Sequence, residues 1–219
     1  MRALLLCLLA LPLAGQVAGE VPLQLRSSKE LWNWFFWEGY DDGKLRVRVV
    51  AQLRSQPHLD TFLRVQGGPV IEYQATAHWN LIAGYYYQHF RTVFADPELQ
   101  GSHRPFAGLE YAFNLKGAAG ETRHLWEYFK NAETRDTARM RSRIRFEFPI
   151  RYAPFVQNEF FYDRLGLQAS RSEIGFAYPI DKNLEFQLSY FREVRPERTG
   201  GTRDVISTRI TFAGPWNKN

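Results

Sequence analysis

The chain alternates hydrophobic and polar residues over ten segments of about ten residues each. In residues 44–54, for example, Val47 follows Arg46 and Val49 follows Arg48. A two-residue period is typical of β-strands with one apolar face, because successive side chains of a strand point to opposite sides. The pattern predicts an all-β protein with strands over residues 44–54, 62–74, 78–90, 104–115, 122–130, 138–150, 153–162, 167–178, 184–194 and 203–212.

The links between these predicted strands alternate in length. Short links and longer polar links follow one another, the short ones at 75–77, 116–121, 149–152 and 179–183 and the longer ones at 91–103, 131–137, 163–166 and 195–202. Bacterial outer-membrane barrels join an even number of strands by short periplasmic turns and longer external loops. The sequence therefore predicts a single up-and-down antiparallel transmembrane β-barrel over residues 44–212.

The number of strands depends on the N-terminal aromatic segment, residues 20–43. Ten strands that start at Lys44 already give an even number. The aromatic stretch Leu31–Glu38 is a further candidate strand, and Val21–Arg26 would then have to supply another to keep the number even. We therefore predict ten or twelve strands.

Residues 1–19 have the organisation of a cleaved secretory signal peptide. Arg2 precedes an apolar run over residues 3–14, which is shorter than the roughly 20 residues that a membrane-spanning helix needs. Cys7, the only cysteine, would leave with this segment, so the mature chain has no disulfide bonds or thiolate ligands. Loss of Arg2 lowers the formal net charge from +5 to +4.

Alternation alone does not say which face of the strands meets water. A soluble barrel has an apolar interior and a membrane barrel an apolar exterior, yet both give the same period. Three features favour the membrane barrel: Trp and Tyr near segment ends, strand lengths close to the roughly 9–11 residues of a tilted crossing, and arginine together with glutamate on the polar face. We therefore expect an outer-membrane protein, in contact with lipid and lipopolysaccharide, whose polar face lines the lumen.

The strongest charge pattern is a ladder within one predicted strand. Arg139, Arg141, Arg143, Arg145 and Glu147 share one face. Arginines two residues apart repel one another unless carboxylates of neighbouring strands lie between them, and arginine pairs well with carboxylates when partly desolvated. The expected partners are Glu110, Glu127, Glu159, Glu173 and Glu185. We interpret the ladder as a structural charge lattice in a narrow lumen; an anion-selective pore lining, or contact with nucleic acid or lipopolysaccharide, are the alternatives.

Short motifs occur in a fixed order between residues 31 and 212: Leu63–Val65 with Pro69–Tyr73, Leu81–Tyr85, Arg123–Tyr128, Arg139–Arg141, Asn158–Phe161 and Ile174–Tyr178. In order and spacing they resemble the bacterial family known as domain of unknown function 2490. The resemblance implies an outer-membrane barrel without an assigned activity and transfers no catalytic residue. Many outer-membrane proteins end on an aromatic residue that the barrel assembly machinery reads, whereas here a tail, residues 213–219, follows Phe212.

The sequence offers little catalytic chemistry. His103 follows Ser102 in a polar stretch that also holds Asp96 and Glu98, but adjacent residues of a strand point apart. The histidines do not have the paired spacing of metal ligands. We therefore predict a non-enzymatic protein, structural or a narrow channel, without metal, cofactor or nucleic-acid partner. The alternatives are a soluble periplasmic barrel that binds an apolar ligand and a lipid-modifying outer-membrane enzyme.

Overall fold

A computed structural model of the chain describes residues 28–55, 62–91, 99–131, 136–196 and 201–214. These residues form eleven β-strands. The strands are β1 (Ser28–Asp41), β2 (Leu45–Ser55), β3 (Phe62–Gln74), β4 (Trp79–Arg91), β5 (Leu99–Leu115), β6 (Ala118–Asn131), β7 (Thr137–Glu147), β8 (Pro154–Asp163), β9 (Gly166–Pro179), β10 (Leu184–Val194) and β11 (Thr202–Ala213). Within the described segments, no helix is long and apolar enough to cross a membrane.

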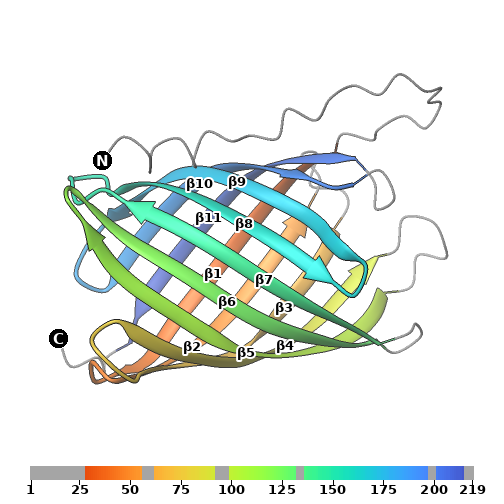
Figure 1. The fold of residues 1–219 in the computed structure, drawn as a ribbon, viewed down its shortest axis with the longest axis horizontal. Coiled ribbons are helices and arrows are strands. Elements are labelled where there is room, and N and C mark those ends of the chain that lie inside the picture. The colour runs from red at the N-terminus through yellow and green to blue at the C-terminus, as the bar shows by residue number, and fades with distance from the viewer. Residues whose placement is uncertain (1–27, 56–61, 92–98, 132–135, 197–200, 215–219) are drawn as a thin grey trace.

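The strands close into one barrel in chain order (Figure 1). Each strand from β2 to β11 pairs antiparallel with the strand before it, as in an up-and-down barrel. The last pairing, between β1 and β11, is parallel and runs from Ser28 beside Arg203 to Glu38 beside Ala213. The predicted all-β, single up-and-down barrel is therefore confirmed.

The strand count differs from the expected ten or twelve. The aromatic stretch Leu31–Glu38 belongs to β1, which is part of the barrel wall, and Val21–Arg26 lies outside the described residues. An even count is required only when the first and last strands pair antiparallel. Because β1 and β11 pair in parallel, eleven strands close the barrel.

The connections gather at two ends of the barrel, which we call the turn end and the loop end. The turn end holds the short links after β1, β3, β5, β7 and β9, and the loop end holds the links after the even-numbered strands (Figure 1). One loop-end link, between β8 and β9, is tight: the Leu165 amide donates to Asp163 at 2.7 Å, and Gly166 has a φ of +94°. With eleven strands, β1 begins at the loop end and β11 finishes at the turn end.

The turn between β1 and β2 is held by Asp42. Its carboxylate accepts hydrogen bonds from the backbone amides of Leu45 at 2.7 Å and Lys44 at 2.9 Å, and from the Tyr40 hydroxyl at 2.8 Å. These donors, with the Leu45 amide first, lower the pKa of Asp42 to about 2. Gly43 supplies the positive φ that the turn requires, +86°.

An apolar cluster lies on the inner wall formed by β2 to β6. It consists of Val50, Val70, Ile82, Phe106 and Leu125, all buried. The inward position of Val50 explains why the alternation of residues 44–54 is interrupted there. Charged side chains of these and the other strands line the rest of the lumen, so the barrel is filled by a mixture of apolar and ionic contacts.

Candidate functional site

The polar faces of the strands point into the barrel. All four arginines of the ladder, Arg139, Arg141, Arg143 and Arg145, line an internal cavity of about 680 Å³. The opposite faces carry large apolar side chains that are exposed on the outside of the barrel, among them Phe35, Val49, Ile71, Leu81, Trp126, Ile174, Tyr190, Ile206 and Phe212. The described barrel therefore has a charged lumen and an apolar outer surface.

Glu127 and Glu159 occupy the positions between arginines that the sequence predicts. Glu127, on β6, contacts Arg139 and Arg141 of β7, and also Arg104 of β5. Glu159, on β8, accepts from Arg141 at 2.7 Å and from Arg171 of β9 at 3.1 Å. Both glutamate side chains are almost fully buried, so these carboxylates obtain their stabilisation from the guanidinium groups in place of water.

The other predicted ladder residues pair only in part as expected. Arg143 lies 3.9 Å from Glu110, one of the expected partners, but donates to Glu121. Arg145 pairs at 2.6 Å with Glu147 of its own strand. Glu173 faces the lumen but accepts its hydrogen bond from the amide of Gln157, at 2.6 Å, with no arginine in ion-pair contact among the described residues.

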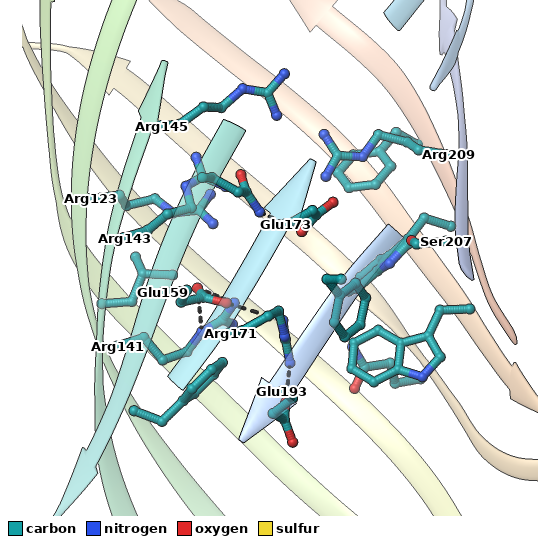
Figure 2. Close-up of a pocket in the computed structure, with 18 of the residues that line it drawn as sticks. Arg123, Arg141, Arg143, Arg145, Glu159, Arg171, Glu173, Glu193, Ser207 and Arg209 are labelled. Carbon is teal, nitrogen blue, oxygen red and sulfur yellow. Dashed lines mark hydrogen bonds and ion pairs between the residues drawn. The ribbon is translucent and has the colours of Figure 1, made fainter. Parts of the chain in front are cut away.

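The ion pairs join into one chain that follows the barrel wall, which we call the charged girdle. It takes one residue from each of eight consecutive strands, with carboxylates and guanidinium groups in alternation. Figure 2 shows its central part, where Arg171 reaches from Glu159 to Glu193. From β1 through β11 to β5, the members are Glu30, Arg203, Glu193, Arg171, Glu159, Arg141, Glu127 and Arg104.

Trp32 and Arg54 stand next to the β1 end of the girdle. The Trp32 indole donates to Glu30 at 2.7 Å, and its ring lies 3.5 Å from the guanidinium carbon of Arg54. The Nε of Arg54 donates to the side chain of Gln52 at 2.8 Å. The flat face of the Arg54 guanidinium group therefore stacks on the indole ring of Trp32. The other N–H groups of Arg54 point outward in the plane of the guanidinium group.

Charge is unevenly distributed along the lumen. A charged residue that lines the cavity belongs to the turn-end half or to the loop-end half of the lumen, according to which end of its strand is nearer. The turn-end half holds six arginines and six glutamates: Arg46, Arg48, Arg123, Arg143, Arg145, Arg209, Glu72, Glu110, Glu121, Glu147, Glu173 and Glu185. The loop-end half holds eight arginines and four glutamates: Arg54, Arg64, Arg104, Arg139, Arg141, Arg171, Arg195, Arg203, Glu30, Glu127, Glu159 and Glu193.

Ser102 and His103, adjacent in β5, point to opposite sides of the barrel wall. Ser102 is fully buried inside the barrel wall, whereas His103 lies on the outside and contacts the rings of Tyr85 and Tyr87. His124, also outside, shares a 3.0 Å hydrogen bond with Ser142 of the next strand. Among the described residues, no group of His, Cys, Asp or Glu is arranged to hold a metal ion.

Five members of the girdle were not identified from the sequence: Glu30, Arg104, Arg171, Glu193 and Arg203. Arg104, Arg171, Glu193 and Arg203 lie on the polar faces of their strands, so the two-residue period already contains the signal that they point inward. Glu30 shares the inner face of β1 with Trp32, Trp34 and Phe36, so the period carries no such signal there. The two-residue period gives no information about the register between neighbouring strands. The register decides which arginine contacts which glutamate.

The fold and the lumen define a closed β-barrel with an apolar outer surface and an ion-paired interior. Residues 29–203 match a family described as "protein of unknown function (DUF2490)", and the chain belongs to this family. The match covers most of the barrel, from the start of β1 to the start of β11. Neither a curated protein nor a solved structure was found to match the chain.

Proposed function

We propose that the protein is an integral β-barrel of the outer membrane, with a structural or narrow-channel role and no enzymatic activity. The observation that carries this proposal is the orientation of the two strand faces. Val49, Ile174 and Ile206, each near the middle of its strand, are 45%, 59% and 52% exposed on the outside. Such a surface is costly in water but is the ordinary outer face of a barrel in lipid.

Aromatic residues on the outer surface support the same assignment. Trp37, Tyr73 and Trp79 are exposed near the turn end, and Tyr87 and Tyr128 near the loop end. Trp and Tyr concentrate at both interfaces of a membrane because their rings tolerate contact with headgroups. The strands are 10 to 17 residues long, enough for the roughly 9–11 residues of a tilted crossing. Outer-membrane lipid, lipopolysaccharide and the assembly machinery are the partners that this assignment requires.

The charged girdle supports a structural or narrow-channel role. Its side chains extend from the wall into the lumen and bind one another, so they occupy space that a wide pore would leave to water. The pair that suggested an enzyme, Ser102 and His103, points to opposite sides of the wall, which supports a non-enzymatic role. A soluble barrel for an apolar ligand needs an apolar lumen, whereas this lumen is lined by many arginines and glutamates, so we do not propose it.

Fractionation of cells that express the full chain tests the location. We expect recovery in the outer-membrane fraction and a band that migrates faster before boiling than after, as folded barrels do. Release of the protein by high salt or by osmotic shock alone would contradict the proposal. Recordings in planar bilayers separate the two roles: small, discrete conductance steps indicate a narrow channel, and their absence indicates that the girdle closes the lumen.

A further inference from the structure

The loop-end half of the lumen carries more positive charge than its own carboxylates neutralise. Eight arginines and four glutamates line this half, an excess of four positive charges among the described residues. The glutamates are already shared: Glu127 contacts three arginines, and Glu193 is within ion-pair distance of three. The turn-end half, with six charges of each sign, has no such excess.

Two of these arginines stand directly opposite each other. Arg54 of β2 and Arg64 of β3 are register partners, and both line the cavity. Arg54 makes no ion pair with any described residue, and its guanidinium group is held in place by Trp32 and Gln52. The N–H groups of Arg54 that point away from Gln52 are therefore held in one orientation before a ligand binds.

We propose that the loop-end half of the lumen binds a multiply charged oxyanion, with phosphate as the recognised group, between Arg54, Arg64 and the girdle. Guanidinium groups match the geometry of phosphate oxygens and bind them in pairs, which makes arginine the usual residue for this ligand class. A dianion or trianion neutralises two or three of these four excess positive charges. The cavity of about 680 Å³, which runs through both halves of the lumen, has room for a small anion and its remaining water. The site belongs to the lumen itself, so it does not depend on the membrane location.

Titration of the full chain, folded in a non-ionic detergent at low salt, with inorganic pyrophosphate tests the proposal. We expect saturable binding that weakens as the salt concentration rises. The variants Arg54→Gln and Arg64→Gln are each expected to weaken binding about tenfold, the loss that one charge-assisted hydrogen bond accounts for. A heat-modifiable band establishes that each variant has folded.

Two matched variants remove the same charge elsewhere. Arg192→Gln acts on the outside of β10, where the arginine side chain is 57% exposed. Arg209→Gln acts in the turn-end half, where Arg209 lies over the Phe36 ring and makes no ion pair with a described residue. Both are expected to bind pyrophosphate within about twofold of the wild type. An equal loss of pyrophosphate affinity in all four variants would overturn the proposal, as would the absence of saturable binding to the wild type.

A second arm identifies the source of the phosphate. Dihexanoyl phosphatidate carries the same group on a short lipid, and its affinity is measured in the same detergent. Tighter binding of pyrophosphate assigns the site to a free anion, and tighter binding of the phosphatidate assigns it to a lipid headgroup. For either ligand, Arg54→Gln must lower the binding affinity more than Arg209→Gln does.

Discussion

Arg141 donates hydrogen bonds to Glu127 at 2.9 Å and to Glu159 at 2.7 Å, so that one side chain of β7 links the two strands beside it. The same relationship repeats around the barrel, where Arg171 joins Glu159 to Glu193. Each guanidinium group has donors on two sides and can serve two carboxylates at once. The lumen is therefore cross-linked by ionic contacts between strands that are also joined by backbone hydrogen bonds.

Substitution of Glu127 tests the energetic weight of this network. Glu127→Gln leaves Arg104, Arg139 and Arg141 around a neutral amide, and because the glutamate side chain is only 1% exposed, water does not replace the lost charge. We expect the free energy of unfolding to fall by about 3 kcal/mol or more. Urea unfolding in detergent, followed by tryptophan fluorescence, measures the change.

Glu147→Gln is the control for that substitution. Glu147 has one arginine partner, Arg145, and its side chain is 40% exposed at the turn end. Its loss should change the free energy of unfolding by less than about 1 kcal/mol. Equal effects of the two substitutions would mean that the girdle adds nothing beyond ordinary surface ion pairs.

The close approach of two strands at Gly108 gives a second prediction. A Cβ added at this position would lie 2.0 Å from the backbone oxygen of His124, which cannot move without distorting β6. We expect Gly108→Ala to destabilise the barrel by roughly 1–3 kcal/mol, the usual range for overpacking. At Gly39 the added Cβ would be 3.5 Å from the Trp37 ring, an ordinary contact, so Gly39→Ala should unfold at nearly the wild-type urea concentration.

Acid should weaken the turn between β1 and β2 through Asp42. The backbone donors that lower the pKa of Asp42 to about 2 are lost on unfolding, where an aspartate has a pKa of roughly 3.9. Its stabilising contribution is therefore complete above about pH 4 and disappears as the pH falls toward 2. The difference in unfolding midpoint between wild type and Asp42→Asn should shrink over this range; a constant difference would show that the carboxylate charge is not involved.

The odd strand number gives a prediction about topology. Because β1 begins at the loop end and the short turns lie at the opposite end, Lys29 and Lys116 should be on different sides of the membrane. In a Cys7→Ser background, a membrane-impermeant maleimide added to intact cells should label Lys29→Cys and leave Lys116→Cys unlabelled until the outer membrane is opened. Labelling of both residues in intact cells would contradict the eleven-strand topology.

The sequence predicts the barrel and its two faces better than the contacts inside it. The two-residue period places Arg139, Arg141, Glu127 and Glu159 on the inner face, and the structure agrees. The period is independent of register, however, and register decides that Arg143 contacts Glu121 whereas Glu173 contacts Gln157.

The closure of the barrel is the other feature that local pattern does not reveal. Glu30 and Arg203 meet only because β1 pairs with β11, at a sequence separation of nearly the whole barrel. The expected even count rests on antiparallel closure, and no property of either strand alone distinguishes a parallel from an antiparallel partner. Both the eleventh strand and the β1 end of the girdle follow from this one long-range pairing.

Insertion into lipid vesicles tests most directly whether the apolar outer face is a membrane surface. Refolded wild-type chain should enter phosphatidylcholine vesicles and give a heat-modifiable, protease-resistant band. Ile174→Arg puts a charge at the middle of the outer face, where it costs about 2–4 kcal/mol in a membrane, and should reduce insertion strongly. Ile150→Arg, in the exposed turn between β7 and β8, should insert like the wild type. Insertion of Ile174→Arg as efficient as that of Ile150→Arg, or a wild-type chain that folds in buffer without lipid or detergent, would contradict the account.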